Sequence, residues 1–304
     1  MKAFKQLLAA TDFSEHSMHA VDRGFLIAKT SGASYTIMHV LESDKLAELR
    51  EWLGEEAAPV SECILQDARD ALAGIFADPV RNNGVSATLQ LEQGLASNAI
   101  PRQAEAIGAD LILLGAHGKG FFRQFLLGST TSHLMRKSKV PVLAVKNEAD
   151  APYRRVLIAT DFSKWSALAI DAARRIAPDA EMLLVHIFDV PFEGKLRHAG
   201  VDEGKIGAYR INARERALQQ LRNLAATADL SVSDYRAAVL HGNPAEQILL
   251  QEEASGCDLI VLGKHGTHIT EELLMGSVTK RVLTESRCDI LVVVSKADNT
   301  VDMA

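Results

Sequence analysis

Short apolar runs alternate along the first half of the chain with longer segments in which apolar residues recur at helical spacing. The apolar runs are residues 6–10, 35–41, 87–91, 111–114 and 140–145, and the helical patterns are residues 15–31, 59–82, 97–107 and 130–137. Apolar runs without polar alternation are typical of strands in a parallel sheet that is covered on both faces. The pattern therefore predicts an α/β fold, and right-handed crossovers favour a doubly wound, five-stranded parallel sheet in the order 3-2-1-4-5.

The second half of the chain repeats this order of elements, with apolar runs at residues 155–159, 182–188, 234–240, 259–262 and 290–294. The sequence Ala-Thr-Asp-Phe-Ser also occurs twice, at residues 10–14 and 159–163. Each copy spans about 145 residues, enough for one hydrophobic core and far longer than a solenoid repeat. We therefore predict two tandem domains, residues 1–147 and 152–296, joined by a short polar stretch that ends in proline.

A glycine-spaced loop follows the fourth apolar run in both halves. It reads Gly115-Ala116-His117-Gly118 and, after nine residues, Gly128-Ser129; the second copy reads Gly263-Lys264-His265-Gly266 and then Gly276-Ser277. Such glycines let backbone N–H groups close on an anion, and the following helix adds its positive dipole end. The loops are candidate phosphate sites, with turn formation and helix capping as the alternative roles.

The first strand of each half ends in an aspartate, Asp12 or Asp161. In the order 3-2-1-4-5, the carboxyl ends of strands 1 and 4 meet at the topological switch point, where open α/β sheets bind ligands. Either aspartate could cap the next helix, but Ser14 and Ser163 suit that role equally well. The aspartates are then available to accept a hydrogen bond from a ribose hydroxyl or an adenine.

Four histidines lie near these candidate sites. His39 and His186 close an apolar strand, where a histidine that is satisfied within the core is commoner than a ligand. His117 and His265 lie inside the glycine loops, but neither has an acidic partner at a recognisable spacing. The sequence therefore specifies no general base.

Charge and composition narrow the function further. A net charge of -6 and a pI of about 5.9 argue against a protein whose main task is to bind nucleic acid. No apolar run is long enough for a membrane helix, and the N-terminus leads directly into a strand instead of a signal peptide, so we expect a cytoplasmic protein with no membrane partner. Cys63, Cys257 and Cys288 are unpaired in number and spacing, which argues against a disulfide or a zinc site, so all three are expected to be buried small hydrophobes.

Together these features resemble the universal stress protein family. The resemblance rests on the G-x-x-G, nine residues, G-[ST] pattern, on the aspartate that ends the first strand, and on the histidine–apolar pair that ends the second. It covers almost the whole chain as two tandem domains. It implies Rossmann-like domains of the adenine nucleotide alpha hydrolase type, cytoplasmic stress-response roles and, in one branch of the family, ATP as the ligand, with or without Mg.

Carried over by position, the resemblance implies one nucleotide site in each domain. Asp12 and Asp161 would contact the nucleoside, and Val40 and Ile187 would meet the adenine through their backbones. The remaining site residues would hold the phosphates, with added hydroxyl groups from Thr131 and Thr279. They are Gly115, Gly118, Gly128, Ser129, Thr130 and Thr131 in the first domain, and Gly263, Gly266, Gly276, Ser277, Val278 and Thr279 in the second.

The two loops differ in charge. The first carries Lys119 and Arg123, whereas the second carries Lys264 and has Glu271-Glu272 at the positions of Arg123-Gln124. If these side chains face the phosphates, the first pocket favours a triphosphate more than the second does. If they point to solvent, salt screens their effect over about 8 Å.

Several enzyme classes lack their motifs in this sequence. It contains no Walker A loop, no G-x-S-x-G elbow and no H-E-x-x-H helix, and no G-x-G-x-x-G fingerprint follows a first strand. The leading hypothesis is a regulatory module that binds adenine nucleotide and is not an enzyme. The alternatives are a weak ATPase or self-phosphorylating enzyme, and an interaction scaffold that binds no nucleotide.

Each predicted domain ends in an apolar strand that its own sheet order leaves at an edge. Unprotected apolar edges invite pairing. We therefore expect the two fifth strands, residues 140–145 and 290–294, to pair within one chain as an internal pseudo-dimer. Homodimer formation by intact chains is a further expectation.

Overall fold

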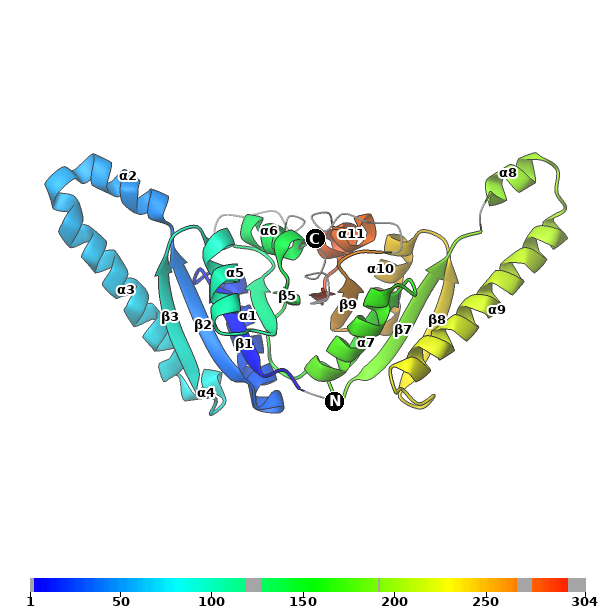
Figure 1. The fold of residues 1–304 in the computed structure, drawn as a ribbon, viewed down its shortest axis with the longest axis horizontal. Coiled ribbons are helices and arrows are strands. Elements are labelled where there is room, and N and C mark those ends of the chain that lie inside the picture. Colours follow the sequence, from blue (N-terminus) through cyan, green and yellow to red (C-terminus); the bar gives the residue numbers. More distant parts are fainter. Residues whose placement is uncertain (1–2, 119–126, 191, 267–274, 295–304) are drawn as a thin grey trace, which may run out of the picture. The chain divides into compact units, whose positions relative to one another are not determined.

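The structure is a computed structural model that describes residues 3–118, 127–190, 192–266 and 275–294 (Figure 1). The chain divides into two compact units: unit 1 runs to Pro152, and unit 2 runs from Tyr153 to Ala297. Within each unit the strands form a parallel five-stranded arrangement with helices on both faces, which confirms the predicted fold class.

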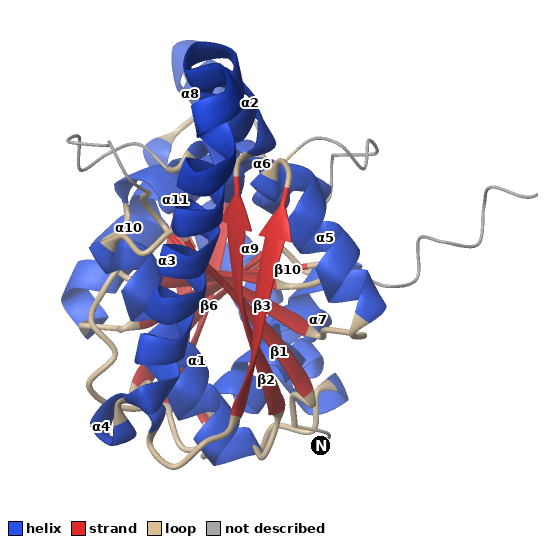
Figure 2. Cartoon of the chain, turned by 90° about the vertical axis from the view of Figure 1, so that its left-hand side faces the viewer, coloured by secondary structure: helices blue, strands red, loops and turns tan. Residues whose placement is uncertain are grey.

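Unit 1 has the strand order β3-β2-β1-β4-β5. Its elements are β1 (Gln6–Thr11), α1 (Glu15–Ser31), β2 (Ser34–Leu41), α2 (Ser43–Leu53), a short 3-10 turn (Gly54–Glu56), α3 (Ala57–Ala77), α4 (Pro79–Asn82), β3 (Ala87–Gln93), α5 (Ala96–Ala106), β4 (Leu111–Gly115), α6 (Ser129–Lys137) and β5 (Val142–Val145). Helices α1, α3 and α4 cover one face of this sheet, and α5 and α6 cover the other (Figure 2).

Unit 2 repeats the same order as β8-β7-β6-β9-β10. Its elements are β6 (Arg155–Thr160), α7 (Lys164–Ile176), β7 (Glu181–Phe188), α8 (Glu193–His198), α9 (Glu203–Thr227), β8 (Tyr235–His241), α10 (Pro244–Ser255), β9 (Leu259–Gly263), α11 (Ser277–Glu285) and β10 (Asp289–Val293). Helices α7 and α9 pack together, as do α10 and α11.

The central strands explain why the apolar runs lack polar alternation. In unit 1, β1 lies between β2 and β4, and Ala9 pairs with Ile37 on one side and Leu113 on the other. All three side chains are fully buried. Helices cover both faces of the strand, so successive residues are apolar although they point to opposite sides.

The structure divides the helix that is predicted for residues 59–82. The chain forms α3 and then α4, which begins at Pro79. Asp78 between them is extended, and its carboxylate accepts hydrogen bonds from the backbone N–H groups of Val80 and Arg81. The proline cannot continue a helix in its interior, so Asp78 ends one helix and caps the next.

Helix α2 is absent from the sequence prediction. Leu46, Leu49 and Leu53 follow helical spacing, although only Leu46 is buried, so the prediction missed a signal that the sequence carries. Within the described residues, no helix has both the length and the apolar character needed to cross a membrane.

We predict that Gly24→Ala destabilises unit 1 by about 1–3 kcal/mol. A methyl group at residue 24 would overlap the phenol ring of Tyr35, which is buried and donates a hydrogen bond from its hydroxyl to the Val21 carbonyl at 2.8 Å. Urea unfolding followed by circular dichroism measures the change.

Gly74→Ala is the matched control. A methyl group there meets no atom within 4 Å, and residue 74 lies inside α3. Alanine is the better helix former, so this substitution should stabilise by about 0.5–1 kcal/mol. Equal effects from the two substitutions would contradict the close packing of α1 on β2.

Candidate functional site

A cavity of about 360 Å³ opens at the carboxyl ends of β1, β2 and β4 in unit 1. All eight residues that the sequence assigns to the first site line it: Asp12, Val40, Gly115, Gly118, Gly128, Ser129, Thr130 and Thr131. They come from four separate elements and their loops. The parallel pairing of β1 with β4 therefore brings the aspartate and the glycine loop to one place, as the strand order predicts.

Asp12 lies half-buried at the end of β1. Its Oδ1 accepts hydrogen bonds from the Ser14 backbone N–H at 3.0 Å and from the Ser14 hydroxyl at 2.5 Å. Ser14 is the N-cap of α1 and accepts from the Ser17 N–H, so the serine takes the capping role and Asp12 orients it.

The residue after this aspartate has an unusual backbone. Phe13 has φ of 61° and Phe162 has φ of 62°, a left-handed conformation that costs a bulky residue about 1–3 kcal/mol. Each ring lies against a histidine: the centroids are 4.3 Å apart for Phe13 and His39, and 4.1 Å apart for Phe162 and His186. The only hint in the sequence is that Phe occurs in both copies of the repeated segment.

The structure corrects the reason for the loop glycines. Neither Gly115 nor Gly118 has a positive φ, so backbone freedom is not what requires glycine at these positions. A Cβ on Gly115 would lie 2.7 Å from backbone atoms of His16 and Ser17, so this glycine lets α1 pack on β4. A Cβ on Gly118 would lie 3.1 Å from Asp12 Oδ2, inside the pocket.

Helix α6 begins at the far side of the pocket. Its N-cap is Gly128, which supplies no side-chain cap, while the Gly128 N–H donates to the Ala116 carbonyl at 2.8 Å. Ser129 in the first turn is exposed. The first N–H groups of a helix lie outside its internal hydrogen-bond ladder, so this end of α6 presents backbone donors and positive dipole to the cavity.

Thr131 has a structural contact that the resemblance does not imply. Its hydroxyl is buried and donates to the Gly115 carbonyl at 2.8 Å, which ties α6 to the end of β4. Thr279 makes the same contact with the Gly263 carbonyl at 3.0 Å. Both hydroxyls thus help to fix the loop that they border.

Unit 2 repeats the arrangement of strand end and loop. A Cβ on Gly266 would lie 3.0 Å from Asp161 Oδ2, and this matches the 3.1 Å between a Cβ on Gly118 and Asp12 Oδ2. Gly276 is the N-cap of α11, whose first residues are Ser277, Val278 and Thr279. Ile187 follows His186 in β7. Ser163 is the N-cap residue of α7, as suggested, but its hydroxyl makes no cap bond. The Ser166 hydroxyl donates to Asp161 Oδ1 at 3.1 Å.

The histidines that close the second strands are satisfied within the core, as predicted. The Nδ1 atom of His39 lies 2.7 Å from the Thr11 carbonyl, and that of His186 lies 2.8 Å from the Thr160 carbonyl. His39 is buried, and burial lowers the pKa of His186. Both rings therefore act first as links between neighbouring strands.

His117 lies in the glycine loop and lines the cavity. Its ring centroid is 5.0 Å from that of His16, which is itself 5.9 Å from that of His19. Burial lowers the pKa of His117, and the nearby His16 and Lys146 lower it further. The imidazole is therefore neutral at pH 7, and acid adds a positive charge beside the loop.

Two groups of residues line the cavity although nothing in the sequence predicts that they belong to the site. Ala96 and Ile100 of α5 add an apolar wall to the cavity. Glu42 and Lys45, after the end of β2, form an exposed ion pair at 2.6 Å on its rim. Their position depends on how α5 and α2 pack, which the spacing of residues does not reveal.

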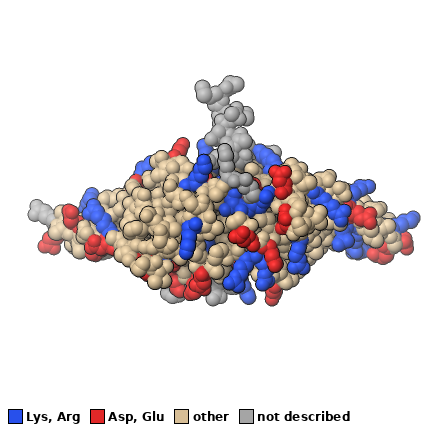
Figure 3. All heavy atoms as spheres, turned by 90° about the horizontal axis from the view of Figure 1, so that it is seen from below, with Lys and Arg blue, Asp and Glu red and all other residues tan. Residues whose placement is uncertain are grey.

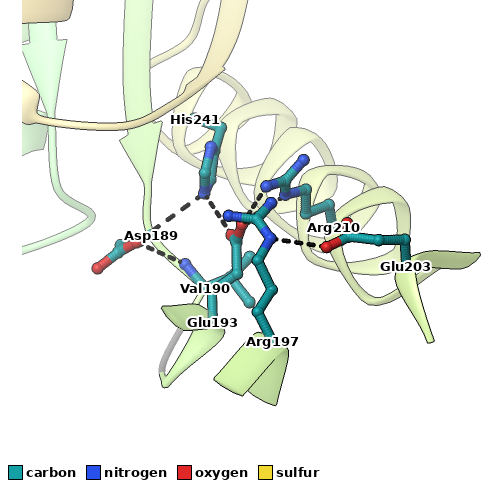
Figure 4. Close-up of polar contacts among 7 residues, drawn as sticks. All are labelled: Asp189, Val190, Glu193, Arg197, Glu203, Arg210 and His241. Atoms are coloured by element: carbon teal, nitrogen blue, oxygen red, sulfur yellow. Dashed lines mark hydrogen bonds and ion pairs between the residues drawn. The ribbon is translucent and has the colours of Figure 1, made fainter. Parts of the chain in front are cut away.

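Unit 2 has a larger charged cluster beyond the end of β7 (Figure 4). The Glu193 carboxylate accepts from Arg210, lies 2.9 Å from Arg197, and approaches His241 Nε2 at 3.1 Å. Arg210 holds the pKa of Glu193 below its ordinary value through this hydrogen bond. The cluster ties α8 to α9 and to the end of β8.

The predicted charge difference between the two loops lies mostly outside the described residues. Lys119, Arg123, Glu271 and Glu272 all fall there, so the stronger triphosphate site in unit 1 stays a prediction. Lys264 is described and is buried. On the face drawn in Figure 3, basic and acidic side chains are interspersed.

Comparison with known proteins covers both units. The profile of the universal stress protein family matches residues 3–146 and 152–294. A universal stress protein of Mycolicibacterium smegmatis is 26% identical over 305 residues, which are 94% of this chain and 96% of that protein. The crystal structure of a universal stress protein from Archaeoglobus fulgidus has a TM-score of 0.66 at 19% identity, over 96% of this chain and 98% of its own.

One further solved relative is a universal stress protein in complex with cAMP. It is 23% identical, with a TM-score of 0.33, over 48% of this chain and 100% of its own.

We predict that His16→Gln raises the pKa of His117 toward its ordinary value, because it removes a neighbouring positive charge. An NMR titration of the imidazole signals measures this shift. His133→Gln is the control, since His133 is not among the groups that perturb His117. An unchanged His117 pKa in His16→Gln would contradict the proximity of the two rings.

Proposed function

This chain belongs to the universal stress protein family as two tandem domains, and we propose that it is a regulatory module that binds ATP in each unit. The observation that carries the proposal is the cavity at the switch point of unit 1, which joins an aspartate, a glycine loop and an open helix N-terminus. The cAMP complex concerns another protein; the proposal for this chain rests on its own pocket.

The triphosphate would lie against the start of α6. Anions bind at helix N-termini because several backbone N–H groups and the positive dipole end converge there. Gly118 and Gly128 have no Cβ, which leaves space for phosphate oxygens to approach the backbone. The exposed Ser129 hydroxyl is an additional donor at this end of the pocket.

The nucleoside would lie at the ends of β1 and β2. Asp12 is a suitable acceptor for a ribose hydroxyl, because the hydrogen bonds from Ser14 hold its carboxylate in place. Val40 borders the cavity beside it, where its backbone can pair with the edge of adenine. Ala96 and Ile100 offer an apolar surface on which the base can rest.

The charges around the pocket are mixed. Lys45 at the rim pairs with Glu42, and His117 is neutral at pH 7, so the attraction for an anion comes chiefly from the N-terminus of α6. Among the described residues, no group of three His, Cys, Asp or Glu side chains is arranged to hold a metal ion.

Unit 2 supports the same proposal through its matching contacts. Asp161 and Gly266 approach each other as Asp12 and Gly118 do, and α11 starts at Gly276 without a side-chain cap. We therefore propose two sites in each chain. Occupancy of these sites would change the affinity for a partner in the cytoplasm. In this way the protein would respond to ATP without hydrolysing it, so no general base is needed.

We predict that Asp12→Ala combined with Gly118→Val weakens ATP binding at the first site by roughly 100-fold, about 2.7 kcal/mol. The first change removes an acceptor, and the second fills the phosphate space with a branched side chain. Isothermal titration calorimetry should then count one site per chain instead of two.

The matched variant Asp161→Ala with Gly266→Val should remove the other site and leave the first. Mass spectrometry of small molecules released from the denatured protein identifies any nucleotide that co-purifies. Full affinity at two sites in both double variants would overturn the assignment. Sustained phosphate release by the wild-type chain would instead favour the weak ATPase.

We also propose that the two fifth strands pair within one chain. β5 ends the strand order of unit 1, and β10 ends that of unit 2. Both strands consist almost entirely of apolar residues, so neither is suited to face water as a bare edge. The covalent link keeps the partner edge at high effective concentration.

We predict that separate polypeptides of residues 1–147 and 152–304 bind each other when mixed, and that each self-associates alone, because each exposes an apolar edge strand. Sedimentation velocity measures both processes. If both polypeptides stay monomeric and do not bind each other, the proposed strand pairing is wrong.

A further inference from the structure

Two of the three cysteines meet at the amino-terminal edge of the sheet in unit 2. Cys257 lies two residues before β9, and Cys288 lies immediately before β10, the strand that pairs with it in parallel. Their Sγ atoms are 3.6 Å apart, and both side chains are buried. Neither forms a disulfide. The third cysteine, Cys63, lies in unit 1 and is exposed.

The turn before β10 holds Cys288 in position. Oε1 of the buried Glu252 accepts hydrogen bonds from the Cys288 N–H at 2.9 Å, the Arg287 N–H at 2.7 Å and the Ser286 hydroxyl at 3.1 Å. The Cys288 thiol donates to the Cys257 carbonyl at 2.8 Å. The two sulfur atoms therefore face each other across a well-fixed turn.

Unit 1 shows that the fold does not need thiols at these positions. The internal repeat aligns Cys257 with Ala109, which is buried before β4, and Cys288 with Val140, which precedes β5. Apolar residues thus fill the same places in the same architecture. The paired thiols are a property of unit 2, and the repeat supplies matched substitutions to remove them.

The two thiols differ in chemical character. The hydrogen bond from Cys288 lowers the pKa of Cys257, while the contact with Cys257 and burial raise that of Cys288. The thiolate is the nucleophile in thiol oxidation, so Cys257 is suited to attack and Cys288 to complete the bond.

We propose that Cys257 and Cys288 form a reversible intramolecular disulfide when the protein meets a hydroperoxide. The Cys257 thiolate attacks one peroxide oxygen, the O–O bond breaks, and the leaving hydroxide takes a proton to become water. The Cys288 sulfur then displaces hydroxide from the resulting sulfenic acid, giving the disulfide and a second water. Each cysteine sulfur is oxidised, hydrogen peroxide is reduced by two electrons, and a dithiol reverses the step by exchange.

The geometry is close to that of a disulfide. Bonded sulfurs lie about 2.05 Å apart, so closure needs a movement of about 1.5 Å, which rotation of the two side chains can supply. The closed loop would contain the glycine loop of unit 2 and α11. A cross-link across this loop restricts the unfolded chain, so the oxidised unit 2 should unfold at a temperature several degrees higher.

The test uses the full chain, reduced and then treated with hydrogen peroxide. Alkylation after denaturation should find three free thiols before treatment and one afterwards, and peptide mapping should place the remaining thiol at Cys63 and join Cys257 to Cys288. The intact mass should fall by two hydrogens, and a dithiol should restore it. Fluorescence of the buried Trp165 in a Trp52→Phe background should report the higher unfolding temperature.

Cys257→Ala and Cys288→Val, the residues of unit 1, should fold normally and lose both the cross-link and the thermal shift. Cys63→Ser should keep both. Free thiols at both Cys257 and Cys288 while peroxide oxidises Cys63 in the same sample would overturn the proposal. So would a linkage through Cys63, or further oxidation of either thiol to sulfinic acid without a cross-link.

Discussion

In each unit the first and fourth strands pair in parallel, and the chain leaves their carboxyl ends toward opposite faces of the sheet. Two loops therefore diverge at one point and leave a space between them. Asp12 lies at the end of one strand and Gly115 at the end of the other, so this single pairing brings the aspartate to the glycine loop. The rest of the site depends on it.

Packing around this point is tight, and it accounts for features that a ligand alone would not explain. Gly115 has no side chain because α1 passes against it, and Thr131 anchors α6 to the same residue. The left-handed Phe13 turns the chain from β1 into α1 and places its ring on His39. These contacts fix the described lining of the pocket, and a prearranged pocket lowers the entropy cost of binding.

The two units share this framework and differ around it. His16 in α1 corresponds to Trp165 in α7, so a titratable neighbour of the glycine loop in unit 1 becomes an aromatic packing residue in unit 2. Unit 2 adds the Glu193 cluster at the carboxyl ends of its strands and the thiol pair at the amino ends. These features lie at opposite edges of one sheet, so a change at one edge need not disturb the other.

The strand order follows from local periodicity, and the eight lining residues of unit 1 follow from the repeated motif together with the family resemblance that it supports. The prediction fails where the cause is contact between distant segments. No spacing rule relates Cys257 to Cys288, which meet only because β9 and β10 pair in register. Likewise, the need for glycine at residue 115 comes from the passage of α1, and the extra wall of the cavity comes from α5. Periodicity predicts which face of a helix or strand is buried. Which atoms lie against that face depends on how the elements pack in three dimensions.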